Sequence, residues 1–193
     1  MISQDILELI RTRRSVRAYT DRPVPDEEIK FIIDCARYAP SGFNMQPWSF
    51  LVITNKEIMR RLSEKGKRTM LNLLESFKDT SKKTSDYYAF LKTKGTDIFH
   101  GAPVLVIILG NKHSATAVYD CTMAAYTMML AAHARGIASC WIGGVHPAIM
   151  DEPSLKELGA PEGNIAVAPL IFGYPKGETP APVREEPKVF WLR

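Results

Sequence analysis

The sequence predicts a single compact domain in which helices and strands are mixed. The chain has 193 residues and is 46% hydrophobic, which suffices to bury one substantial core but argues against two independent domains. Apolar residues recur at helical spacing in some segments and form short continuous runs, typical of buried strands, in others. We therefore interpret residues 1–193 as one domain.

Three helices are predicted from hydrophobic periodicity and from residues that begin or end helices. The first is expected to begin after Ser3, which is a good N-cap residue. The second starts in the Pro-Asp-Glu-Glu stretch of residues 25–28 and is stopped by Pro40. The third covers about residues 115–135, is rich in Ala and Met, and ends at Gly136. Because this helix is apolar on nearly every side, we expect it to run through the core.

Strands are predicted at residues 48–54, 104–109 and 165–172, where apolar runs are short and rich in branched side chains. Residues 65–100 have weak periodicity and many lysines, so we expect helical cover or a mobile flap outside the core. Residues 174–187 are rich in proline and predict an extended arm.

Charge and hydropathy exclude several classes of protein. The formal net charge is only +4, and the lysines of residues 65–94 are diluted by acidic residues without interleaved aromatic repeats, as on a solvated face. The longest apolar run, residues 102–109, is far shorter than the ~20 residues that cross a bilayer. The N-terminus is charged and helix-like rather than signal-like. We expect a cytoplasmic protein with no nucleic-acid or membrane partner.

Cysteine and histidine usage gives no sign of a metal site. Cys35, Cys121 and Cys140 are widely spaced in apolar sequence, which is typical of buried thiols. None of the four histidines stands at a metal-ligand spacing from a cysteine or a carboxylate. We expect His133, on the apolar third helix, to be a hydrogen-bonded core residue, and we single out His100 as the one histidine with a possible role in function.

An arginine-rich motif, Arg13-Arg14-Ser15-Val16-Arg17, follows the first helix. Arginine offers planar, forked donors that match phosphate oxygens, and Ser15 adds a hydroxyl donor. On its own, the motif is more typical of a helix end that carries solvated arginines. A phosphate site is therefore a hypothesis that needs further motifs.

The loop between the second helix and the first strand is rich in groups that form hydrogen bonds. Its turn-forming and polar residues are Pro40, Ser41, Gly42, Asn44 and Gln46. Such a loop can donate and accept hydrogen bonds along the edge of a planar heterocycle, and prolines at both ends limit its flexibility. The alternative is an ordinary turn, because the same residue types favour turns.

A third motif, Cys140-Trp141-Ile142-Gly143-Gly144, is interpreted as a strand that runs into paired glycines. Glycine lets the flat face or the edge of a ligand approach the backbone N–H groups closely. The alternative is a plain tight turn.

The proline-rich arm contributes one further candidate, Arg184. Few other cations stand near it in the sequence. It could close over a phosphate or could be solvated.

Taken together and in this order, these motifs resemble the nitroreductase family of FMN enzymes. The resemblance covers nearly the whole chain. It rests on the arginine motif with Tyr19 after it, the loop of residues 39–48, the run of residues 136–144 and the Phe-Gly-Tyr-Pro of residues 172–175.

The resemblance implies an α+β fold with a central, mostly antiparallel sheet flanked by helices. It also implies a homodimer in which a C-terminal arm reaches the partner and each FMN lies between the two subunits. Such enzymes take hydride from NADH or NADPH and pass it to a small acceptor, such as a nitroaromatic compound or a quinone, by ping-pong turnover. The flavin carries the hydride chemistry, so no catalytic acid or nucleophile of the protein is implied.

The resemblance also implies roles for individual residues. Arg13, Ser15 and Arg184 are expected to bind the FMN phosphate, with Arg14 nearby. Arg17 is expected at the pyrimidine end of the flavin, where its charge favours the anionic reduced state.

The remaining implied contacts come from the loop and from the glycine turn. Pro40, Ser41, Gly42 and Asn44 are expected to come from the partner subunit, with Gln46 in support. In the turn Ile142-Gly143-Gly144, the N–H of Gly143 is expected to face flavin N5. Relatives often carry an acidic residue where this chain has Gly143. Residues 65–100 match no family pattern and correspond to a variable lid.

Three other functions remain open at the level of sequence. The same FMN scaffold could serve another reaction, such as dehalogenation or flavin fragmentation. A flavin-binding protein without catalysis is a second alternative, and a basic interaction protein acting through the lysine-rich segment is a third. The sequence chooses neither NADH nor NADPH and does not name the acceptor.

Overall fold

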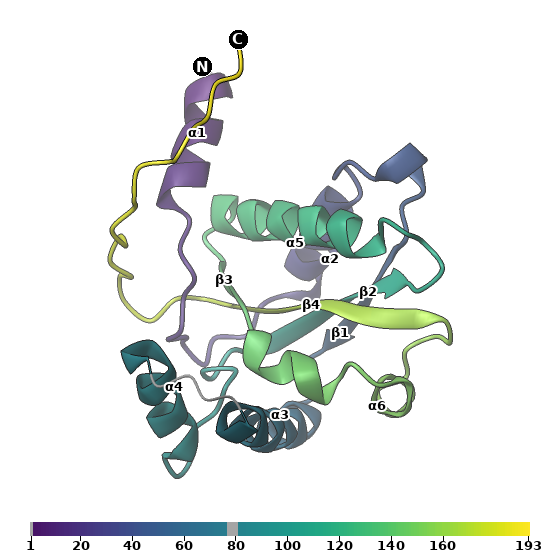
Figure 1. Cartoon of the computed structure of the whole chain (residues 1–193), viewed down its shortest axis with the longest axis vertical. Helices are drawn as coiled ribbons and strands as arrows, with labels where there is room; N and C mark the ends of the chain where they lie inside the picture. Colours follow the sequence, from purple (N-terminus) through teal and green to yellow (C-terminus); the bar gives the residue numbers. More distant parts are fainter. Residues whose placement is uncertain (1, 77–80) are drawn as a thin grey trace.

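The computed structural model describes residues 2–76 and 81–193, and its centre is a sheet between two layers of helices (Figure 1). In these ranges four strands form one sheet in the order β1-β2-β4-β3, and all neighbouring strands are antiparallel. The strands are β1 (Trp48–Ile53), β2 (Val104–Asn111), β3 (Ala138–Trp141) and β4 (Asn164–Gly173). The three strands predicted from apolar runs are confirmed to within two residues, and β3 confirms the strand that leads into the paired glycines.

Helices cover both faces of the sheet, as the α+β prediction requires. One face packs against α2 (Asp26–Ala36) and α5 (Ala117–Ala134), and the other against α3 (Lys56–Ser76), α4 (Lys82–Lys92) and α6 (Glu152–Glu157). Two short 3₁₀ helices, η1 (Gly42–Asn44) and η2 (Gly143–Ala148), follow α2 and β3. The α2 helix begins within the predicted start signal, directly after Pro25.

Strand β2 is buried on both faces because its side chains alternate between the two helical layers. Leu105 and Ile107 belong to the core cluster on the α3 side, whereas Val106 and Ile108 belong to the cluster on the α5 side. All four are fully buried. This explains the absence of polar positions in the apolar run of residues 102–109.

Helix α5 buries only one side. Its buried face includes Cys121, Ala125 and Met128, whereas Tyr119 and Met123 are exposed on the opposite face. The prediction of a helix ended by Gly136 is confirmed. The prediction that this helix runs through the core is wrong, because the face that carries Tyr119 and Met123 is exposed. Apolar side chains on an exposed face indicate a surface for another element or chain.

The lysine-rich segment of residues 65–100 is helical, but it is not outside the core. The α3 helix begins at Lys56, before this segment, and ends within it. The α4 helix lies wholly within the segment. Leu91, Ile98 and Phe99 are buried in the core cluster on the α3 side, so the expectation of a flap outside the core is wrong for them. Part of the predicted flap, residues 77–80, lies outside the described residues.

Two smaller predictions are corrected. Helix α1 (Ile2–Thr12) already contains Ser3, so this residue does not precede the helix as a cap. Cys121 and Cys140 are buried free thiols as predicted, but Cys35 is only partly buried. In contrast, the arm prediction is confirmed, because the chain beyond β4 is extended and exposed from Lys176 onward.

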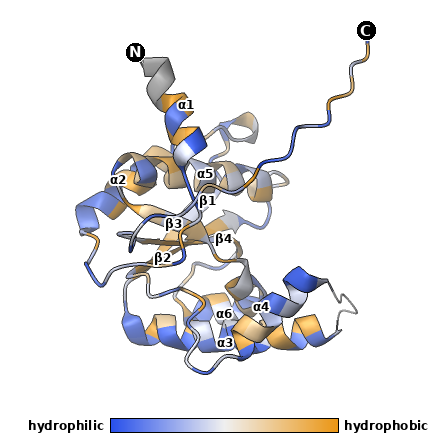
Figure 2. Ribbon diagram, turned by 90° about the vertical axis from the view of Figure 1, so that its left-hand side faces the viewer, coloured by the Kyte–Doolittle hydropathy of each residue, from blue (hydrophilic) through white to orange (hydrophobic). Residues whose placement is uncertain are grey.

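Figure 2 shows that α1 and the C-terminal arm extend from the same end of the molecule, beyond the two packed layers. Ile6, Leu7 and Ile10 of α1 are exposed, and so are Phe190 and Trp191 of the arm. None of the helices in the described ranges is both long enough and apolar enough to cross a membrane.

Candidate cofactor and acceptor site

The segment after α1 runs beside β3, and this pairing organises the site. Ser15 and Ser139 form an isolated parallel bridge, in which the Val16 N–H donates to the Ser139 carbonyl at 3.1 Å. Val16 is buried, whereas Ser15 is partly exposed and Arg17 is exposed. In an extended segment neighbouring side chains point to opposite sides, so burial of Val16 directs Ser15 and Arg17 away from the core. Tyr19 anchors the far end of the segment, where its buried hydroxyl donates to the Val16 carbonyl at 2.8 Å.

The arginine cavity, which we name for Arg13 and Arg14, has a volume of about 580 Å³. It lies between the end of α1, β3 and the base of the C-terminal arm. Its other lining residues are Thr12, Val16, His133, Gly136, Ile137, Ala138, Ser139, Pro175, Gly177, Glu178 and Thr179, of which Glu178 is the one carboxylate. The structure thus brings the predicted phosphate residues Arg13 and Arg14 together in one cavity, with Ser15 on the adjoining bridge to β3.

Arg13 carries donors that are buried but have no partner. Its Nε and Nη1 atoms are inaccessible to solvent and form no hydrogen bond with any described residue. The guanidinium lies 5.9 Å from the centre of the Tyr126 ring. Unpaired buried donors are costly, so these atoms need an acceptor that the single chain does not supply. A phosphate oxygen has the charge and the geometry to satisfy them.

Arg14 has a different task within the chain. Its Nη1 donates to the carbonyl oxygens of Arg11 at 2.6 Å and of Arg13 at 2.9 Å. These bonds satisfy backbone acceptors at the C-terminal end of α1, where helices leave carbonyls unpaired. Arg14 therefore holds the motif in place beside the cavity.

His133 also borders the arginine cavity, and it is partly buried rather than a core residue. Its Nε2 lies 2.9 Å from the Thr12 hydroxyl, so the prediction of a hydrogen-bonded histidine is confirmed and the prediction of a core position is wrong. Burial, followed by the charges of Arg13 and Arg14, lowers the pKa of His133. The cations around this cavity thus disfavour a further positive charge.

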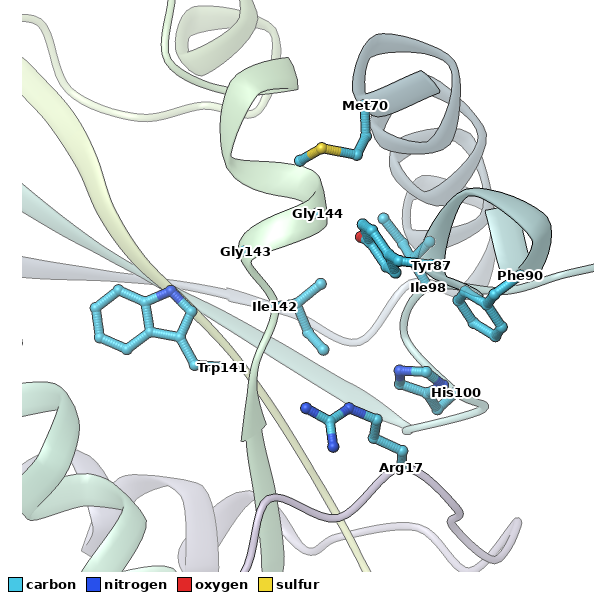
Figure 3. Close-up of a pocket in the computed structure, with 10 residues that line it drawn as sticks. All are labelled: Arg17, Met70, Tyr87, Phe90, Ile98, His100, Trp141, Ile142, Gly143 and Gly144. Carbon is cyan, nitrogen blue, oxygen red and sulfur yellow. The ribbon is translucent and has the colours of Figure 1, made fainter. Parts of the chain in front are cut away.

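A second cavity, the aromatic cavity, also has a volume of about 580 Å³ and lies where β3 ends (Figure 3). Arg17 borders it on one side, and Tyr87, Phe90 and His100 form a wall of rings on another (Figure 3). Its remaining lining residues are Met70, Ile98, Trp141, Ile142, Gly143 and Gly144. The predicted residues Arg17, Ile142, Gly143 and Gly144 are therefore brought together in this cavity.

The two glycines of the turn have different surroundings. A Cβ atom at Gly143 would meet nothing within 4 Å, whereas a Cβ atom at Gly144 would overlap the hydroxyl of Tyr87. The space above Gly143 is thus open, and a flat ligand can approach its backbone there. At Gly144, a side chain would force the Tyr87 hydroxyl of α4 to move. The N–H of Ile142, bonded to the Pro169 carbonyl at 2.9 Å, fixes the start of the turn.

The loop of residues 40–46 is built by its own polar groups and by α5. The Gly42 N–H donates to Asp120 Oδ1 at 3.1 Å, and the Ser41 hydroxyl accepts from the Gln46 N–H at 3.1 Å. The side-chain amide of Gln46 donates to Asn44 Oδ1 at 3.2 Å. Gln46 thus supports the loop itself, and its supporting role at a cofactor site stays a prediction.

Two groups of predicted residues lie apart from both cavities in a single chain. Neither the loop of residues 40–46 nor Arg184 belongs to the linings of the arginine and aromatic cavities. Arg184 is exposed and forms no hydrogen bond or ion pair with any described residue. Phe43 is fully exposed at the tip of the loop. Their contribution to a site from the partner subunit stays a prediction.

The sequence did not identify the aromatic wall as part of the site. Tyr87 and Phe90 stand three residues apart on α4, so they lie on the same side of the helix, and Met70 comes from α3. In the sequence, only the weak helical periodicity of residues 65–100 indicated that these side chains share a face. Burial raises the pKa of Tyr87, which keeps its hydroxyl neutral.

The two buried cysteines, Cys121 and Cys140, offer no nucleophile. Burial raises the pKa of Cys121 to about 12, and burial also raises the pKa of Cys140 despite the nearby Arg17. Both therefore remain thiols near neutral pH. In the described parts of the chain, no three or more His, Cys, Asp or Glu side chains are arranged to hold a metal ion.

The fold and the two cavities together define a class of protein, and comparison with known sequences identifies it. The profile of the nitroreductase family matches residues 10–174. The chain belongs to the nitroreductase family, as the motifs predicted.

Individual relatives support this assignment. The chain is 33% identical over 180 residues to an Archaeoglobus fulgidus protein named "Putative NADH dehydrogenase/NAD(P)H nitroreductase", covering 91% of this chain and 88% of that one. The structure is similar to a nitroreductase with bound FMN from Desulfitobacterium hafniense, with a TM-score of 0.81, 28% identity and 98% of each chain covered. An iodotyrosine deiodinase of Thermotoga neapolitana is 26% identical over 69% of this chain and 71% of its own length.

The two glycines provide a test of the cavity's geometry. Gly144→Ala should lower the free energy of unfolding by about 1–3 kcal/mol, because the added methyl group must displace Tyr87. Gly143→Ala is the matched control, and it should leave stability unchanged or raise it by up to about 1 kcal/mol. Urea denaturation of the protein without added cofactor measures both. Equal effects of the two substitutions would show that α4 does not press against the turn.

Proposed function

We propose that this protein is an FMN-dependent oxidoreductase that accepts hydride from NADH or NADPH and passes it to a small planar acceptor. The observation that carries the proposal is Arg13, whose buried donors lack a partner beside the arginine cavity. This cavity borders one end of β3, and the open glycine turn follows the other end. Membership of the nitroreductase family and the similarity to a nitroreductase with bound FMN support the choice of cofactor.

The residues present fit the parts of FMN. Arg13 and Ser15 are suited to the phosphate, because they supply charged and hydroxyl donors at the start of the segment that pairs with β3. Gly143 lies at the other end of β3, where its open backbone suits the edge of the flavin ring. The parallel pairing of the segment with β3 thus sets the phosphate end and the ring end of the site apart along one line.

When bound, FMN supplies the two-electron chemistry that amino-acid side chains lack. The protein contributes charge, orientation and exclusion of water. Arg17 places a permanent positive charge at the aromatic cavity, where it favours negative charge that develops during reduction. Met70, Phe90 and Ile98 make much of the cavity wall apolar, which strengthens the electrostatic effect of Arg17.

We also propose that the working unit is a homodimer with shared sites. Exposed apolar side chains gather on α5, on α1, at the tip of the loop and on the arm. They include Ile6, Leu7, Ile10, Phe43, Met45, Val118, Tyr119, Met123, Tyr126, Phe190 and Trp191. Apolar surface on this scale is typical of an obligate interface. A partner on this surface would bring its loop of residues 40–46 and its arm with Arg184 to the site, as the family resemblance implies.

Reductive dehalogenation is the second candidate function. The similarity to an iodotyrosine deiodinase favours it, and the ring-lined aromatic cavity accepts a phenol as readily as a nitroaromatic compound. Turnover of the reduced protein with a nitroaromatic, a quinone and an iodophenol, followed by product analysis, distinguishes the reactions. A flavin-binding protein without catalysis would instead be reduced only slowly by NADH and NADPH.

Direct identification of the cofactor tests the central proposal. The purified protein should be yellow, contain about one FMN per chain and lose its flavin absorption on mixing with NADH or NADPH. Anion-exchange chromatography of the heat-released cofactor identifies it, and stopped-flow absorption measures the reduction. Recovery of FAD, of riboflavin or of no flavin after reconstitution would refute the proposal.

Arg13 and Arg17 should respond differently to substitution. Arg13→Ala should weaken FMN binding by about 10- to 150-fold, which corresponds to the loss of a charge-assisted hydrogen bond of roughly 1.5–3 kcal/mol, and saturating FMN should restore reduction. Arg17→Ala should slow reduction by NADH and NADPH even at saturating FMN, because a stabilising charge is lost. Arg37→Ala, which removes an exposed arginine paired with Asp34, is the control. Full rescue of Arg17→Ala by FMN would limit Arg17 to holding the cofactor.

The dimer is tested by a charge on α5. Met123→Asp should shift the protein toward monomers and lower FMN occupancy, because the side chain lies on the exposed apolar face. Val52→Asp places the same charge on an exposed side chain of β1 and should change neither property. Light scattering and the flavin-to-protein absorbance ratio report the two effects. A monomer with full FMN occupancy would contradict the shared site.

A further inference from the structure

His100 is held in a turn that its own sequence does not favour. Its φ is 56°, in the left-handed region that non-glycine residues rarely adopt. The Asp97 carboxylate closes the turn by accepting from the N–H groups of Phe99 at 3.0 Å and of Gly101 at 2.9 Å. The His100 N–H also donates to the Asp97 carbonyl at 3.1 Å. The three hydrogen bonds hold His100 in this strained backbone conformation, and strain maintained in this way is common at functional sites.

The turn fixes the imidazole at the aromatic cavity. Phe99 is buried in the core on one side, whereas the next residue, His100, lines the cavity. The His100 ring stacks on Phe90 at 5.8 Å, and Phe90 stacks on Tyr87 at 6.2 Å. Figure 3 shows His100 and Arg17 side by side at one end of the cavity. The ring nitrogens of His100 form no hydrogen bond with any described residue, so they are available to a bound molecule.

The proposed reaction needs a proton as well as a hydride. A quinone that takes up hydride becomes a hydroquinone anion, and the oxygen that carries the charge must then be protonated. Among the residues that line the aromatic cavity there is no carboxylate and no lysine. Arginine side chains are not proton donors in proteins near neutral pH. Burial raises the pKa of Tyr87. His100 is therefore the one lining side chain suited to proton transfer near neutral pH.

We propose that His100 is the proton donor to a quinone-type carbonyl acceptor bound in the aromatic cavity, an inference that rests on the proposed function. The acceptor gains hydride from the reduced enzyme. The hydride displaces a pair of π electrons of the acceptor, and this pair moves onto the carbonyl oxygen. An O–H bond forms there as an N–H bond of the His100 imidazolium breaks. The products are the neutral hydroquinone and a neutral imidazole, which regains its proton from water.

The surrounding charges determine how this step depends on pH. The groups that face His100 are Arg17, Tyr87 and Asp97, and Lys67 of α3 reaches the same turn by donating to the Thr96 carbonyl at 3.4 Å. Burial and then Arg17 lower the pKa of His100, and Asp97 opposes them. The proton-donating form therefore grows as pH falls below neutrality. Negative charge on the acceptor oxygen favours the same form at the moment of transfer.

His100→Asn tests the proposal, because asparagine tolerates a positive φ and keeps an amide but cannot transfer a proton. Protein reduced beforehand with NADH is mixed with a benzoquinone, which needs a proton, or with ferricyanide, which takes electrons alone. In the unmodified protein the quinone rate should fall as pH rises from 5 to 8. In His100→Asn it should be about 10²- to 10⁴-fold lower and independent of pH, whereas the ferricyanide rate should be unchanged.

Two controls separate proton donation from a structural role. His113→Asn changes an exposed histidine and should leave both rates and the pH profile unchanged. Phe90→Leu removes the stacked ring but keeps the imidazole, so its quinone rate should still fall as pH rises. An equal loss of quinone and ferricyanide rates in His100→Asn, or a retained pH dependence, would overturn the proposal. Failure of NADH and NADPH to reduce the unmodified protein would instead refute the proposed function.

A measurement without turnover completes the test. In NMR spectra of the oxidised protein, addition of benzoquinone should shift the imidazole signals of His100 and leave those of His113 in place. Assignment comes from the two asparagine variants. Unmoved His100 signals at saturating quinone would overturn the proposal even if the oxidoreductase activity is present.

Discussion

The site depends on one short backbone pairing, the parallel bridge between Ser15 and Ser139. It ties the segment after α1 to β3, so that Arg13 faces the arginine cavity while Arg17 reaches the aromatic cavity. The same segment pairs on its far side with the chain that leaves β4, where the Thr20 N–H donates to the Tyr174 carbonyl at 2.9 Å. The base of the arm is thereby held next to the arginine cavity. Arg13 and Arg17 are only four positions apart on one segment, yet they border two different cavities.

Much of the fold could be predicted because the sheet is buried on both faces. The residues of β2 and β4 are apolar almost without interruption, and such runs are recognisable as strands without tertiary information. The helical cover was harder to predict. The buried positions of α3 include Ser63 and Gly66, which do not register as apolar in a periodic pattern. The Ser63 hydroxyl accepts from the Ile98 N–H at 3.0 Å, a contact between residues 35 positions apart.

The site could be predicted where local motifs carry it and not where tertiary packing assembles it. The arginine motif and the glycine turn each bring their donors from a single short segment, so their residue types suffice. The ring wall needs α3, α4 and the Asp97 turn to converge, and no segment shows that by itself. In the sequence, His100 stood out only by its position at the end of the predicted flap, residues 65–100. The contribution of Arg184 and of the loop of residues 40–46 depends on a second chain, and remains a prediction.

The aromatic cavity has a chemical character that follows from its charges. Arg17 is its only permanently charged lining residue in the described parts of the chain, and the rest of the wall is aromatic or aliphatic. A cationic acceptor would meet Arg17 across a medium of low dielectric constant, where repulsion is strong. A neutral or anionic planar acceptor meets attraction from the same charge, and the stacked rings favour its flat face. Hydride arriving at such an acceptor adds negative charge next to Arg17. Arg17 therefore stabilises the negative charge that develops during hydride transfer more than it stabilises the uncharged acceptor, which is the condition for catalysis by electrostatic complementarity.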